Sequence, residues 1–199
     1  AAAYAGGLRA DDLARQADEI DEVKQRLEGI RVLKGVEADI LQDGRIDFND
    51  AVLGQLDFVI ASIHTRFNMG EREMTARVLA VMDNPHLIII GHPTGRLLLS
   101  RDPYGLDLDA VIEKAAATGV ALEINADPHR LDLDWRTVRR ARSRGVAISI
   151  GADAHSAAGI ANVEYGVSMA RKGWVGPEDV LNAAPVDAFL ARAAQRKSG

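Results

Sequence analysis

The sequence contains no cysteine among its 199 residues. This absence excludes disulfide bonds, thiolate metal sites and a cysteine nucleophile, and it fits a reducing compartment such as the cytoplasm. Long apolar runs are also missing, since none approaches the roughly 20 residues that a membrane-spanning helix needs. The first residues lack the basic-then-apolar pattern of a signal peptide. We therefore expect a cytoplasmic protein without a membrane partner.

An excess of positive charge is missing as well. The formal net charge is −5, which excludes the overall basic surface of many nucleic-acid-binding domains but leaves room for local arginine clusters. The sequence has no Gly-rich phosphate loop, no Gly-x-Ser-x-Gly elbow and no dinucleotide fingerprint. With 47% apolar and 27% charged residues, the chain has the composition of a globular domain of ordinary size.

Apolar, β-branched segments alternate along the chain with segments of helical periodicity. Strands are expected at residues 30–36, 57–63, 87–91, 120–124 and 146–150. Helices are expected at residues 8–28, 71–82, 107–118, 133–144, 160–172 and 177–196, with breaks around Gly173 and at Pro177 and Pro185. Residues 49–56 are expected to form a short helix at best. This alternation predicts an α/β fold with a parallel sheet, and the nearly continuous apolar strands predict that both faces of the sheet are covered.

Polar side chains stand at the C-terminal ends of all the expected strands. In strand order they are Glu37, His64, His92, Asn125, and the pair Asp153 and His155. Active sites of parallel sheets and β/α barrels are built at this edge, so we expect these side chains to converge. Carboxylate oxygens and imidazole nitrogens suit zinc, manganese or iron, and a carboxylate such as Glu37 can bridge two ions.

Each of these residues also has a simpler interpretation when it is taken alone. His64 could be an ordinary hydrogen-bond partner, and His92 could shape a turn because Pro93 follows it. Asp153 could cap the next segment, and Glu37 could pair with an arginine. These separate explanations do not account for the convergence of all the residues on one edge, which favours a metal centre.

Arginines gather near the same edge. Arg66 follows His64 closely, Arg96 lies in the loop after His92, and Arg130 follows Asn125. Guanidinium groups bind phosphate oxygens in a bidentate manner, so these arginines and Asn125 are candidates for binding a phosphoester substrate. The alternative is that Arg66 and Arg130 pair with surface carboxylates, which contributes little energy.

The two other histidines differ in position. His86 precedes its strand, so we expect it at the opposite edge of the sheet in a surface or structural role. His129 lies on the same edge as the candidate site and is a weaker candidate for a substrate contact.

Six short segments together resemble the polymerase and histidinol phosphatase (PHP) domain, and most closely the PHP domain at the C-terminal end of bacterial family X DNA polymerases. They occur in order and span essentially the whole chain: 35–41 (GVEADIL), 61–64 (ASIH), 91–96 (GHPTGR), 123–125 (EIN), 130–135 (RLDLDW) and 153–156 (DAHS).

The resemblance implies a distorted seven-stranded, TIM-like β/α barrel with up to three divalent metal ions, usually manganese or zinc, with iron as a further option. It implies phosphoester hydrolysis, and in this branch 3′–5′ exonuclease activity and DNA 3′-end processing in repair, with DNA as substrate and an upstream polymerase domain in the parent chain. Matched residue by residue, the metal ligands are Glu37, His64, His92, Asp153 and His155. Among them, Glu37, His64 and Asp153 are expected to act in catalysis.

The chain departs from the family pattern at its start. The family opens with a His-x-His motif after the first strand and an Asp-His pair after the second, and neither is present. We therefore expect residues 1–199 to form a single PHP domain that holds the last five β/α units, with 174–199 as its C-terminal helical segment. The alternatives are a stand-alone small-molecule phosphatase of the histidinol phosphatase type and a catalytically incomplete structural PHP domain.

Overall fold

The computed structural model describes residues 7–198. One parallel sheet with the strand order β1-β2-β3-β4-β5 runs through its centre. Its strands are β1 (Gly35–Asp39), β2 (Phe58–Ser62), β3 (Leu87–Ile90), β4 (Ala121–Asn125) and β5 (Ile148–Gly151). Because each strand pairs with the next one along the chain, the sheet has the topology of a partial TIM-like barrel. The expected α/β fold with its parallel sheet is confirmed.

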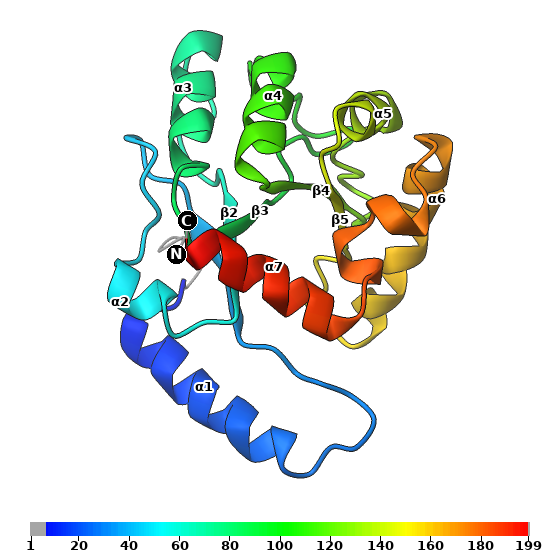
Figure 1. Ribbon diagram of the computed structural model, residues 1–199. Helices are drawn as coiled ribbons and strands as arrows, with labels where there is room; N and C mark the ends of the chain where they lie inside the picture. Colours follow the sequence, from blue (N-terminus) through cyan, green and yellow to red (C-terminus); the bar gives the residue numbers. More distant parts are fainter. Residues whose placement is uncertain (1–6, 199) are drawn as a thin grey trace.

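Helices alternate with the strands and cover both faces of the sheet. They are α1 (Ala10–Lys24), α2 (Asp50–Leu53), α3 (Glu71–Val81), α4 (Leu108–Thr118), α5 (Trp135–Ser143), α6 (Val163–Lys172) and α7 (Val186–Ser198). In Figure 1, α3, α4 and α5 lie along one side of the sheet, α7 crosses the other side, and α1 stands apart. Within residues 7–198, none of the helices combines the length and the apolar character needed to cross a membrane.

Side-chain caps fix where the helices after β3 and β4 begin. The Asp107 carboxylate accepts hydrogen bonds from the first N–H groups of α4, and the Asp134 carboxylate does the same for α5. Gly119 ends α4 in the left-handed conformation, with φ of 75°, which a glycine adopts without steric cost. These caps set the residues at which α4 and α5 begin and at which α4 ends.

Two apolar clusters explain why the strands are apolar on both faces. The larger cluster lies between the sheet and the helices α3, α4 and α5, and it includes the fully buried Leu122 and Ile124. The second cluster joins Ile89 of the sheet to Phe189 of α7, and the Phe189 ring meets the Phe58 ring edge-on at 5.4 Å between centroids. Helix α7 therefore covers the sheet face that the other helices leave open.

The first strand lies later in the chain than the sequence predicts. Residues 30–34 are outside the sheet, and β1 begins at Gly35, which is opposite Phe58, the first residue of β2. Two hydrogen bonds between Lys34 and Asp57, of 2.7 and 2.8 Å, join the segments that precede β1 and β2. Residues 30–33 therefore have no strand opposite them, and Glu37 lies within β1 instead of after it.

The C-terminal segment 177–196 is broken at its prolines, as the sequence predicts. Short 3-10 turns occupy Pro177–Asp179 and Leu181–Ala183, and α7 begins after Pro185. A proline has no N–H group to donate within a helix, so Pro177 and Pro185 each open a new segment. A further 3-10 turn, Ala158–Asn162, occupies the expected start of α6.

Candidate metal centre

A cleft of about 610 Å³ opens beside the C-terminal ends of the strands. The polar side chains that line it are Gln16, Glu37, Asp39, His64, His92, Arg130, Asp153 and His155. Leu8 and Leu13, at the start of the chain, line it too. The cleft therefore gathers the predicted metal-ligand residues against the N-terminal segment.

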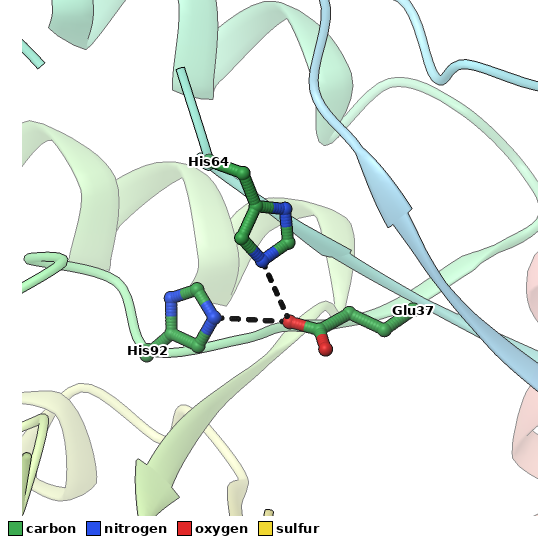
Figure 2. A group of neighbouring side chains, drawn as sticks. All are labelled: Glu37, His64 and His92. Atoms are coloured by element: carbon green, nitrogen blue, oxygen red, sulfur yellow. Dashed lines mark ion pairs between the residues drawn. The ribbon is translucent and has the colours of Figure 1, made fainter. Parts of the chain in front are cut away.

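Three of these side chains meet around a single carboxylate oxygen. Glu37 Oε1 lies 3.0 Å from His92 Nε2 and 3.5 Å from His64 Nε2. Figure 2 shows both imidazole rings directed at this oxygen from two neighbouring strand ends, with Glu37 reaching them from β1. Within residues 7–198, this is the one group of at least three histidine or acidic side chains close enough to hold a metal ion.

The Glu37 side chain is held as an anion. Its burial alone would raise the pKa, but hydrogen bonds from His64 and His92 outweigh the burial and hold the pKa of Glu37 well below its usual range. The carboxylate is therefore in the charge state that a metal ligand needs at neutral pH.

Asp39 fixes the orientation of the His64 ring. The Nδ1 atom of His64 lies 2.5 Å from Asp39 Oδ1, so Nε2 is directed to Glu37. Burial alone would lower the pKa of His64, but Asp39 and Glu37 outweigh it and raise the pKa to about 9. A carboxylate that binds the second nitrogen of a histidine is the usual support of a metal-binding imidazole.

His92 is held from behind by Glu123. The His92 side chain is buried, and its backbone N–H donates to Glu123 Oε2 at 2.6 Å, with a backbone φ of 26°. Burial, together with the charges of Glu37, Asp153 and Asp132, raises the pKa of Glu123 to about 8. A left-handed backbone at a non-glycine residue is strained, so the hydrogen bond to Glu123 helps to keep His92 at the cleft.

The sequence interpretation missed Asp39 and Glu123 as parts of this site. Asp39 belongs to β1 and lies two residues after the predicted site residue Glu37, and Glu123 belongs to β4 and lies two residues before the predicted site residue Asn125. Side chains two residues apart on a strand point to the same face, so this spacing was the available signal.

The three converging side chains fit a divalent metal ion. Two ligands bound to one ion at about 2.1 Å lie roughly 3.0–3.5 Å apart for octahedral or tetrahedral angles. The separations of 3.0 and 3.5 Å from Glu37 Oε1 agree with that range. One carboxylate and two imidazoles also form a donor set typical of zinc, manganese and iron sites.

Asp153 and His155 line the same cleft but do not join this three-residue group. The Asp153 carboxylate accepts a hydrogen bond from Asn125 Nδ2 at 2.9 Å and lies 3.6 Å from Arg130 Nε. His155 is exposed, and its Nδ1 donates to the backbone carbonyl of Asp153 at 2.8 Å. This bond leaves the Nε2 atom of His155 as the free acceptor of the ring.

The predicted arginines occupy different positions. Arg130 lines the cleft, whereas the Arg96 guanidinium donates to the backbone carbonyls of Arg130, at 2.9 Å, and of Leu131. Arg66 is exposed in the turn after β2 and is not part of the cleft lining. Arg96 therefore supports the loop that presents Arg130.

The two remaining histidines lie outside the cleft. His86 precedes β3, at the opposite edge of the sheet, with Nε2 3.9 Å from Asp50. His129 is exposed and pairs with Asp127 at 2.9 Å.

The chain is similar in sequence to bacterial enzymes of two kinds. It is 46% identical to DNA polymerase/3'-5' exonuclease PolX of Bacillus subtilis over 94% of this chain, and it spans 34% of the length of that protein. It is 31% identical to a probable phosphatase of Syntrophotalea carbinolica over 80% of this chain and 68% of the relative.

The chain belongs to the PHP family of phosphoesterase domains. A further relative of this PHP domain is a probable phosphatase of Caldanaerobacter subterraneus, 37% identical over 52% of this chain and 40% of the relative. A scan against protein-family models gave no match.

Proposed function

We propose that this PHP domain is a metal-dependent phosphoesterase that removes nucleotides from DNA 3′ ends, as a 3′–5′ exonuclease in repair. The observation that carries the proposal is the meeting of Glu37 Oε1 with the Nε2 atoms of His64 and His92 at the floor of a polar cleft. Such a donor set holds a divalent ion, which supplies charge neutralisation and an activated water for attack on a phosphoester.

The metal ligands in this proposal are Glu37, His64 and His92, with Asp153 and His155 as ligands for further ions. Up to three ions of manganese or zinc, with iron as an alternative, would be held in the intact domain. The Nδ1–H group of His155 donates a hydrogen bond to a backbone carbonyl, so the lone pair of Nε2 is available to bind a metal ion. Glu37, His64 and Asp153 are the residues we assign to the reacting centre.

Substrate binding is assigned to arginines around the cleft. Arg130 lines the cleft 3.6 Å from Asp153, so its guanidinium is placed to bind a phosphate oxygen beside the metal ligands. Asn125 orients Asp153 through its hydrogen bond. Arg96 acts by supporting the Arg130 loop, and Arg66 extends the positive charge to the rim.

The choice of DNA as the substrate rests on the 46% identity with a protein named polymerase and exonuclease. In the same proposal, residues 1–199 form one PHP domain that includes the helical segment 174–199. The protein works in the cytoplasm, and a polymerase domain precedes the PHP domain in the parent chain.

The test is Mn²⁺-dependent release of nucleotides from a 5′-labelled single-stranded DNA by the parent protein. We expect Glu37→Gln and Asp153→Asn to reduce the rate at least 100-fold, because each neutralises a ligand that the ion needs. His86→Gln is the matched control, since His86 lies at the opposite edge of the sheet. Wild-type rates in the Glu37 and Asp153 variants would refute the assignment.

A second candidate function is a small-molecule phosphatase, which the relatives named probable phosphatases favour. The two functions differ in the bond that is hydrolysed, because a phosphatase cleaves monoesters and an exonuclease cleaves diesters. The catalytic efficiency of the same preparation on histidinol phosphate and on an oligonucleotide decides between them.

A further inference from the structure

Both tryptophans of the chain lie on the flank of the domain where α5 and α6 meet, and neither lines the cleft of the metal centre. Trp135 begins α5, and Trp174 follows α6. The backbones meet closely here, because a Cβ added to Gly173 would lie 3.1 Å from the Trp135 carbonyl oxygen. Figure 1 shows α5 and α6 side by side on this flank.

Cationic side chains lie over both indole rings. Arg136 and Lys172 lie 4.7 and 5.4 Å from the centre of the Trp135 ring, and Arg139 lies 5.1 Å from that of the Trp174 ring. We call these five residues the tryptophan patch. All three cations are exposed.

The cations of the tryptophan patch differ from the other arginines of α5. Arg140 pairs with Asp109 at 2.7 Å, and Arg142 pairs with Asp179 at 2.7 Å. Within residues 7–198, no carboxylate lies within 4.0 Å of the charged nitrogens of Arg136, Arg139 or Lys172. The nearby Asp134 carboxylate is occupied by backbone N–H groups at the start of α5. The patch is therefore positive in a chain of net charge −5.

Trp174 is unusually open for its residue type. The residue is 68% exposed, and its backbone φ of 64° lies in the left-handed region. An exposed indole leaves a large apolar surface in water, and a left-handed backbone at a bulky residue is strained, so packing of the fold does not account for the position of Trp174. An aromatic plane open to solvent among unpaired cations is the composition of surfaces on which bases stack while phosphates are bound.

We propose that the tryptophan patch binds single-stranded DNA, with a base stacked on Trp174 and phosphates held by Arg136, Arg139 and Lys172. A duplex offers this surface its phosphates but not the faces of its bases, so a single strand fits better. Negative charge over the rest of the chain disfavours a polyanion elsewhere and directs it to the patch. None of the five residues lines the cleft, so the patch adds a second contact for a strand whose end lies there, and in this role it rests on the proposed function.

The test uses the intrinsic tryptophan fluorescence of the 199-residue chain, which reports only on Trp135 and Trp174. We expect a 15-residue oligothymidylate to quench the fluorescence saturably. The affinity should fall with salt with a log–log slope of about −2, as three phosphate contacts on a single strand predict. Arg139→Glu should weaken binding at least tenfold, whereas Arg72→Glu, an equal charge change at an exposed residue of α3, should weaken it less than twofold.

Trp174→Ala should weaken binding by about 5- to 150-fold, the loss expected for one stacked base. Circular dichroism confirms that each variant is folded. Absence of quenching by the wild-type chain, equal affinity for duplex DNA or a polyglutamate peptide, or equal losses in the Arg139 and Arg72 variants would overturn the proposal. A preference for oligouridylate over oligothymidylate would also overturn the assignment to DNA.

Hydrolysis of bis-p-nitrophenyl phosphate, measured with the parent protein, separates this proposal from the proposed function. Trp174→Ala and Arg139→Glu should leave it unchanged, because the small diester does not reach the patch. Glu37→Gln should abolish it and leave the quenching by oligothymidylate intact. Failure of one activity therefore does not imply failure of the other.

Discussion

Replacement of Asp39 by Asn tests whether the hydrogen bond behind His64 supports a metal ligand. The change keeps the shape of the side chain but removes its charge from the partner of His64 Nδ1, 2.5 Å away. A hydrogen bond with a charged partner contributes about 1.5–3 kcal/mol, and the Asn oxygen retains part of this. Loss of such supporting partners lowers metal affinity about 10- to 100-fold, or roughly 1.4–2.7 kcal/mol.

The affinity is measured by competition between the protein and a fluorescent chelator for Mn²⁺ and Zn²⁺ at pH 7.5. Asp43→Asn is the matched control, because Asp43 lies in the turn after β1 and pairs with the exposed Arg45. We expect the Asp39 variant to bind at least tenfold more weakly and the Asp43 variant to match the wild type. Equal affinities in all three proteins would refute the role assigned to Asp39.

Three further predictions concern stability. Burial raises the pKa of Asp132, so the folded state retains this proton to a higher pH than the unfolded state, and the contribution of Asp132 to stability falls as the pH rises above about 4. Asp132→Asn removes this loss, so urea unfolding of the metal-free protein from pH 4 to 8 should show the stability of the variant relative to the wild type growing with pH. Phe189→Ala removes the edge-on contact with Phe58 and should cost about 3 kcal/mol of unfolding free energy in the same assay, with no loss contradicting the packing of α7 on the sheet. Arg196 donates hydrogen bonds to four backbone carbonyls near the ends of α3 and α4 and the start of β3. Arg196→Ala removes these bonds and should lower the unfolding free energy by about 2 kcal/mol, and a change under about 0.5 kcal/mol would contradict this.

The strand ends could be predicted because their chemistry changes abruptly. The apolar run 87–91 stops at His92, and the run 57–63 stops at His64. A parallel sheet brings such ends to one edge, so the meeting of these histidines followed from the pattern alone. The position of Glu37 within β1 did not follow, because residues 30–34 look like a strand in the sequence, whereas β1 pairs with β2 only from Gly35 onward.

The supporting residues of the site could not be predicted from strand ends. Glu123 lies inside an apolar strand, and its role depends on the backbone of His92, which is distant in the sequence. Asp153 lines the cleft, and its hydrogen bond with Asn125 depends on the left-handed turn after β5, with φ of 50°. Such contacts arise from loop conformations that residue patterns do not encode.

The central claim is that Glu37, His64 and His92 hold a divalent ion together. The most direct measurement is the anomalous X-ray scattering of crystals grown with Mn²⁺ or Zn²⁺. We predict a peak within about 2.3 Å of Glu37 Oε1 and of the Nε2 atoms of both histidines, as in protein sites for these metals. Crystals saturated with metal that show no peak between these three atoms would contradict the account.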